Sequence, residues 1–143
     1  MSANYHQDIV AWAEEQARLL RAGRFEHLDI EHLAEEIEDV GKSEQRELAN
    51  RMTLLVAHLL KWRYQSERRG TSWELTIRNQ RRGILRRLER TPSLRAQLSD
   101  SEWWQDVWDD GIVQAIQETG LTAFPLSCPW SAEDMLREGW LPE

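Results

Sequence analysis

The sequence of 143 residues contains little cysteine, proline or glycine, with one, four and seven residues respectively. The single cysteine, Cys128, excludes an internal disulfide, which agrees with a reducing compartment. No apolar run approaches the ~20 residues of a transmembrane helix, so we expect no membrane span. The glycines are scattered singly, which excludes a glycine-rich phosphate loop. The N-terminus has no basic region followed by an apolar stretch, so we expect no signal peptide and a cytoplasmic location.

Strand signals are also nearly absent. The chain has no alternating β-branched run, and no Asn-Gly or Asp-Gly pair stands between two such runs as in a hairpin. Apolar residues instead recur at three- and four-residue steps through most of the chain. This periodicity predicts one all-α domain over residues 1–143, a bundle of about five main helices with a short C-terminal helix.

The helix boundaries follow from glycines, prolines and capping residues. Helices are predicted at residues 3–21, 30–40, 42–65, 71–90 and 93–118, with a last short helix capped by Ser131. Gly41 indicates a brief break or kink between the second and third helices. The fifth helix is expected to bend near residues 99–101. The face of the second helix expected to pack inward consists of Ile30, Leu33, Ala34, Ile37 and Val40.

The net charge of −7 conceals a strong asymmetry along the chain. Residues 1–60 carry a net charge of −6, residues 61–95 carry +8 and residues 96–143 carry −9. One interpretation is that the basic segment packs against its acidic neighbours and is neutralised within the molecule. The other is a basic face for an anionic partner. We favour the first, because the acidic flanks would repel a nucleic-acid backbone.

The helix predicted at 42–65 has a wide apolar stripe that also contains three polar residues. The apolar members are Leu48, Met52, Leu55, Val56, Leu59 and Leu60. Glu44, Arg51 and His58 stand seven residues apart within the same sector, and they drift by about 20° per heptad. Buried charges without partners cost several kcal/mol, so these residues should form contacts.

Two interpretations of this polar seam remain open. In the first, the seam is a structural network in which Arg51 bridges Glu47, one turn before it, and a carboxylate of another helix. His58 has no acid within one turn on its own helix, so its partner is expected from a different helix. In the second, Glu44, Glu47, Arg51 and His58 form an acid–base or metal site inside the bundle.

A metal site has only weak candidates in this sequence. Glu36 and Asp39 stand three apart, like half of a carboxylate metal site, and His58 is the remaining candidate ligand. No Glu-x-x-His motif and no zinc spacing occurs. We therefore expect no metal and no cofactor.

Several stretches stand out as a set between Tyr5 and Pro142. They are "AWAEEQARLLRAGRFEHLD", "HLAEEIEDVGKSE", "LLVAHLLKWRYQ", "SWELTIRNQR" with "PSL", and "CPWSAEDMLREGWLPE". Together, and in this order, they resemble the bacterial family catalogued as domain of unknown function 29. The resemblance implies an all-α fold in a bacterial, cytoplasmic protein. It implies no activity, and no catalytic residue can be transferred from it.

The function favoured by the sequence is a non-enzymatic module that binds a protein partner or a second copy of itself. Its basis is the absence of catalytic motifs, the segregated charge and the eight tryptophans of this acidic chain. The first alternative is a helical-bundle enzyme or metal-binding protein built around His58, Arg51 and the nearby carboxylates. The second is nucleic-acid binding through residues 61–95, which the acidic flanks disfavour.

Overall fold

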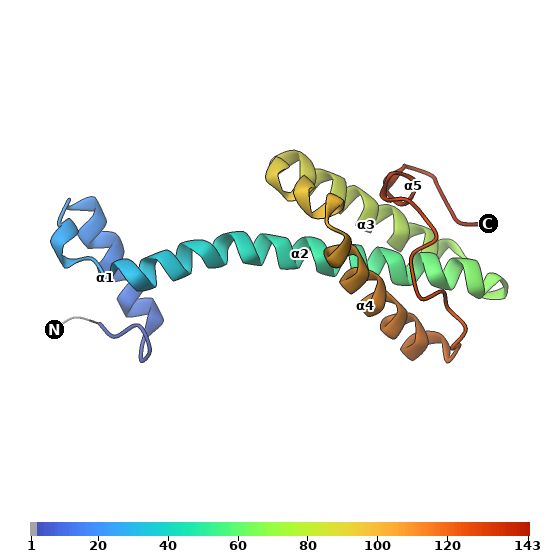
Figure 1. Ribbon diagram of the computed structural model, residues 1–143, viewed down its shortest axis with the longest axis horizontal. Helices are drawn as coiled ribbons and strands as arrows, with labels where there is room; N and C mark the ends of the chain where they lie inside the picture. Colours follow the sequence, from blue (N-terminus) through green and yellow to red (C-terminus); the bar gives the residue numbers. More distant parts are fainter. Residues whose placement is uncertain (1–2) are drawn as a thin grey trace. The chain divides into compact units, whose positions relative to one another are not determined.

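The computed structural model describes residues 3–143, and within this range it contains helices and no strand, which confirms the all-α prediction (Figure 1). The α-helices are α1 (Ile9–Arg21), α2 (Ile30–Tyr64), α3 (Thr71–Arg90), α4 (Ser101–Thr119) and α5 (Ala132–Leu136). The short 3-10 helices are η1 (Phe25–His27), η2 (Ser66–Arg68) and η3 (Pro92–Ser99). Contacts divide the chain into two compact units, 3–43 and 44–143, which are described separately. The expectation of a single domain over 1–143 stays a prediction.

Unit 3–43 is held together by polar contacts of Asp29, the residue before α2. The indole of Trp12 on α1 donates to the Asp29 carboxylate at 3.0 Å, and the Asp29 backbone N–H donates to Gln16 Oε1 at 2.9 Å. Trp12 and Gln16 are both buried. The helix predicted from residue 3 begins at Ile9, because the Asp8 side chain accepts from the Ala11 N–H and caps it there.

The apolar face expected to pack inward at the start of α2 is largely exposed, so that prediction is wrong. Ile30, Ile37 and Val40 are 70%, 70% and 67% exposed. Only Leu33 of this set is partly covered. The N-terminal segment contacts a different side of α2, where the Tyr5 ring stacks on His32. That packing leaves the row of Ile30, Ile37 and Val40 open.

The break predicted at Gly41 is also wrong, because α2 is one continuous helix of 35 residues that includes Gly41. Glycine in a helix interior costs only about 1 kcal/mol relative to alanine. Good helix formers on both sides, and the packing of the following residues, outweigh that cost.

Replacement of Gly41 by alanine is therefore expected to raise the free energy of unfolding by about 0.5–1 kcal/mol. A Cβ at this position would meet no atom within 4 Å, so no clash opposes the gain. Urea denaturation measures the change. The control is Gly23→Ala, which should destabilise the protein because Gly23 has a φ of +71°. A loss of stability in Gly41→Ala would contradict an unbroken helix.

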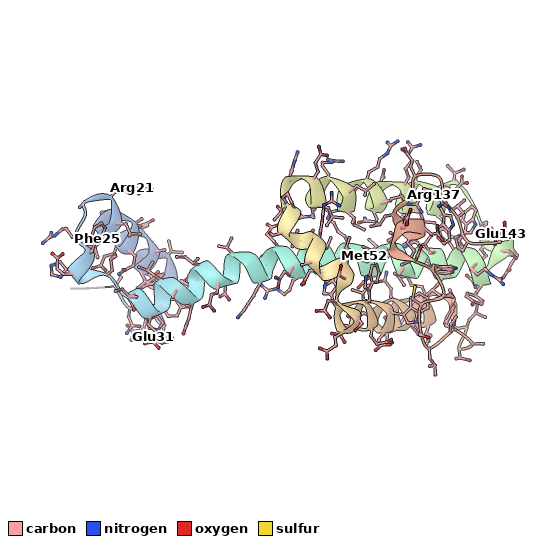
Figure 2. All side chains as sticks on the ribbon, turned by 45° about the horizontal axis from the view of Figure 1, so that its top comes forward. Arg21, Phe25, Glu31, Met52, Arg137 and Glu143 are labelled. Atoms are coloured by element: carbon pink, nitrogen blue, oxygen red, sulfur yellow. The ribbon has the colours of Figure 1, made fainter. Side chains whose placement is uncertain are left out.

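In unit 44–143, α3 and α4 lie beside the second half of α2 (Figure 1). The apolar stripe expected on α2 is buried, which confirms it as the central element of this core, with Met52 near its middle (Figure 2). The buried core consists of Leu48, Met52, Leu55, Val56, Leu59, Leu60, Ile77, Ile84, Leu88, Leu94, Val107, Trp108, Ala115 and Met135.

The predicted fifth helix is divided at Asp100. Pro92–Ser99 forms η3, and the Asp100 carboxylate then accepts from the N–H groups of Glu102 and Trp103 to cap α4. The bend expected near residues 99–101 is thus confirmed as a change of helix type. Ser131 caps α5 as predicted, accepting from the Asp134 N–H at 3.0 Å.

The C-terminal segment is fastened to the core by a buried arginine. Arg81 on α3 is only 3% exposed, and its guanidinium donates to the Met135 carbonyl at 2.8 Å and to the Trp140 carbonyl at 2.7 Å. Burial lowers the pKa of Arg81. Trp130 packs edge-on between Trp108 and Trp140. Arg81 and the tryptophan contacts therefore hold the C-terminal segment, from Trp130 to Trp140, against the core.

None of the helices in residues 3–143 combines the length and apolarity that crossing a bilayer would require.

Candidate functional site

Three of the four seam residues come together between α2 and α3. Arg51 Nε donates to Glu47 Oε1 at 3.1 Å, which confirms the contact expected across one helical turn. Arg51 Nη1 also approaches Gln80 Oε1 on α3 at 3.4 Å. Glu44, expected within the buried sector, has a side chain that is 45% exposed.

The guanidinium that bridges two carboxylates is Arg87, which the sequence did not single out. Arg87 Nη1 donates to Glu44 at 3.0 Å and Nη2 lies 3.4 Å from Glu47. Its side chain is 29% exposed, so water screens these ion pairs only in part. The seam thus ties α3 to α2 with alternating charges, as a structural network between helices would.

His58 does not join this network. It lies two turns beyond Arg51 on α2, about 10 Å along the helix axis. Its Nδ1 donates to the Leu54 carbonyl at 3.0 Å, so the expectation of a partner from another helix is wrong. The carbonyl one turn earlier is within reach because side chains on a helix point back toward its N-terminus. Burial lowers the pKa of His58, which keeps the imidazole neutral near pH 7.

Arginines from two helices surround a groove of about 440 Å³ beside the seam. Arg51 on α2 faces Arg86, Arg87 and Arg90 on α3, and Glu44 supplies a carboxylate to the wall. Gly83 lies in the groove wall, and a Cβ there would stand 2.9 Å from Arg51 Nη1. The spacing of Gly83, Arg86, Arg87 and Arg90 at steps of three, one and three was the available sequence signal for this face of α3.

Two other basic residues of the 61–95 segment pair with acids inside the unit, so the expected neutralisation is met in part. Lys61 is buried, and its Nζ lies 2.6 Å from Glu118 on α4 and over the Trp73 ring. The hydrogen bond from Lys61 holds the pKa of Glu118 below its usual range. Arg82 pairs with Glu138 at 2.9 Å. The segment is therefore compensated in part, and the groove holds some of the arginines that pair with no acid within residues 3–143.

Cys128 is a partly buried residue that packs against the core. Its Sγ donates to the Trp130 carbonyl at 3.2 Å, and burial raises the pKa of the thiol. A thiol held in its protonated form is a poor nucleophile.

A separate cluster of titratable side chains lies in unit 3–43. His32 Nδ1 and the Asp29 carboxylate are 2.8 Å apart, and the Tyr5 hydroxyl donates to Glu36. The bond to Glu36 raises the pKa of Tyr5 to about 12. The contact with Asp29 raises the pKa of His32, and that with His32 lowers the pKa of Asp29.

This ion pair predicts a stability window in pH. The His32 contribution is complete below the ordinary histidine pKa of 6.5 and is lost as pH rises through the raised folded value. The Asp29 contribution is present above 3.8 and is lost as pH falls through the lowered folded value. Asp29→Asn should therefore lower the pKa of His32 toward 6.5, measured by NMR titration. Glu38→Gln is the control, and an equal shift in both variants would contradict the pairing.

The weak metal candidates are not brought together. Glu36 accepts from Tyr5 in unit 3–43, where Asp39 is an exposed residue of α2, and His58 belongs to unit 44–143. Within residues 3–143, no group of three or more His, Cys, Asp and Glu side chains is placed to hold a metal ion.

Comparisons with known proteins assign no chemistry to this chain. A search of curated proteins and a search of solved structures each gave no match. A family model described as a domain of unknown function, DUF29, matches residues 4–141, which is almost the whole chain. The protein therefore belongs to the DUF29 family, whose function is unknown.

Proposed function

We propose that the protein is a protein-interaction module that binds through the exposed row of Ile30, Ile37 and Val40. The observation that supports this is their exposure of 70%, 70% and 67% on one helix. At about 100° per residue these side chains fall within roughly 80° of one another, so they form one stripe. Such a stripe of large apolar side chains is typical of a surface that another protein covers.

Burial of the exposed row would supply a useful binding free energy. Removing a valine or isoleucine side chain from water contributes about 1.5–3 kcal/mol. Phe25, in η1 of the same unit, is also exposed, at 62% (Figure 2). A stripe three helical turns long matches the length over which a helix docks on a helix.

The charges around the exposed row indicate the chemistry of the partner. Residues 1–43 carry ten acidic and four basic side chains, a net charge of −6. Glu31 and Glu38 flank the row on one side of the helix at about 80–100° from Ile30. A second copy would bring like charges together, which is unfavourable. The complementary partner is an amphipathic helix with an apolar stripe flanked by lysine or arginine.

A photo-crosslinking amino acid at position 37 tests this proposal in the full-length protein. Crosslinked peptides should map to an amphipathic helix with basic flanks in the partner. Ile30→Glu should abolish the product, while changing the free energy of unfolding by no more than about 0.5 kcal/mol because the side chain is exposed. Val113→Glu is the matched control, since Val113 is 53% exposed on α4, which belongs to unit 44–143.

Three outcomes would contradict the proposal. The first is the absence of a crosslink at position 37, and the second is a product that survives Ile30→Glu. The third is a product that maps to a second copy of this chain, which would show that the row serves self-association instead.

A further inference from the structure

The arginine groove between α2 and α3 carries more positive charge than its neighbours neutralise. Four guanidinium groups line it, from Arg51, Arg86, Arg87 and Arg90. Glu44 and Glu47 pair with Arg87 and Arg51. Within residues 3–143, Arg86 and Arg90 form no ion pair, so the groove keeps a surplus of positive charge.

The groove walls offer the donors that an oxyanion requires. Guanidinium groups present paired N–H donors that match the oxygens of phosphate and carboxylate. The Asn79 amide and the Thr91 hydroxyl also line the groove and can donate to the same ligand. Arg86 and Arg90 need not be withdrawn from a buried partner, because both side chains are exposed.

Gly83 on α3 leaves the space that Arg51 of α2 occupies beside the groove. A Cβ at Gly83 would stand 2.9 Å from Arg51 Nη1 and 3.6 Å from Arg51 Cζ. Glycine at this position therefore lets the Arg51 guanidinium lie against α3 at the groove wall. Without that room Arg51 would turn away, and the cations would come from α3 alone.

The dipole of α3 explains part of this arrangement but not all of it. Arginines in the last turn of a helix are stabilised by its C-terminal carbonyls, which applies to Arg87 and Arg90. It does not account for Arg51, which comes from α2, or for the glycine that admits it. Convergence of cations from two helices on one groove is the arrangement of a site for an anion.

We propose that this groove binds a small phosphorylated molecule, with its phosphate group held by Arg86, Arg87 and Arg90. A volume of about 440 Å³ falls in the range of small-molecule sites. The phosphate displaces the Glu44 carboxylate from Arg87, so Glu44 occupies the site until the ligand arrives. A long polyanion is disfavoured, because residues 96–143 of the same unit carry a net charge of −9.

Calorimetric titration of the full-length protein with pyrophosphate tests the proposal. Arg86→Gln and Arg90→Gln should each weaken binding about tenfold or more, the usual effect of losing a hydrogen bond between charged groups. Glu44→Gln should strengthen binding, because it removes the competing carboxylate. Arg82→Gln is the control on the same helix, since Arg82 pairs with Glu138 outside the groove, and its affinity should match that of the unmodified protein.

The comparison of Arg82→Gln with Arg86→Gln separates a site from general charge attraction. Nonspecific attraction would make Arg82→Gln weaken binding as much as Arg86→Gln, and this would overturn the proposal. Absence of pyrophosphate binding, or weaker binding in Glu44→Gln, would overturn it as well. Tighter binding of a single-stranded oligonucleotide, with a steep salt dependence, would assign the surface to nucleic acid instead.

Discussion

Arg81→Ala should lower the free energy of unfolding by about 3–5 kcal/mol, the largest effect expected of any single substitution considered for this protein. The change removes a buried guanidinium and leaves the carbonyls of Met135 and Trp140 without their donor. It also opens a cavity beside the core. Urea denaturation followed by tryptophan fluorescence measures the loss.

Neighbouring and conservative variants give this prediction its controls. Arg82→Ala should change stability by no more than about 0.5 kcal/mol, because Arg82 is exposed and its ion pair is at the surface. Arg81→Lys keeps the charge but cannot supply the forked pair of donors. Its loss of stability should therefore lie between those of Arg82→Ala and Arg81→Ala. Limited proteolysis should cut residues 132–143 faster in Arg81→Ala. Equal stability of the Arg81 and Arg82 variants would contradict the anchoring role.

Gly111→Val should destabilise the protein by about 3 kcal/mol, the second large effect. Gly111 is where α4 crosses α2, and a Cβ there would stand 2.5 Å from Val56 Cγ1 and 3.2 Å from Val56 Cβ. Val56 is fully buried and β-branched, so its side chain strongly prefers one χ1 rotamer and yields poorly to a new contact. The two helices must therefore separate, and the core around Trp108 must loosen.

Two further substitutions distinguish this clash from a general effect of valine in a helix. Gly41→Val should be close to neutral, because the space around Gly41 is open. Val56→Ala introduced together with Gly111→Val should recover part of the lost stability, since it removes the contacting methyl groups. Thermal or urea unfolding of the unmodified protein, Gly111→Val, Val56→Ala and the double variant gives the coupling free energy between the two positions. Additive losses in the double variant would show that the crossing does not depend on this contact.

Much of the fold could be predicted because its signals are local. The period of the apolar residues predicted the helices, and Ser131 was predicted to cap the last helix from its residue type. The Asp100 cap, which divides the helix predicted at 93–118, was not predicted. The Arg51–Glu47 contact was predictable for the same reason, since residues four apart on a helix are neighbours. The apolar stripe centred on Leu55 was wide enough to mark a central helix.

The candidate site was predicted only in part. The seam was placed at Glu44, Glu47, Arg51 and His58, but His58 bonds to its own helix and stays outside the network. The residue that bridges the two carboxylates, Arg87, is 43 residues away from Glu44 in sequence. No local pattern distinguishes Arg87 from the other arginines of α3. Arg81 left a weak signal, because it continues the apolar spacing of Ile77, Ile84 and Leu88, yet its partners lie near the C-terminus.

The sequence by itself determined that the chain is helical, where most helices begin and end, and which stripe of α2 forms the core, because all of these depend on residues within a few turns. Only the tertiary structure decided which cations are neutralised and which are left to line a groove. It also decided that Ile30, Ile37 and Val40 stay exposed although their spacing matches that of a buried face. Burial of such a face requires a second element to cover it, and helical periodicity cannot say whether the chain supplies one.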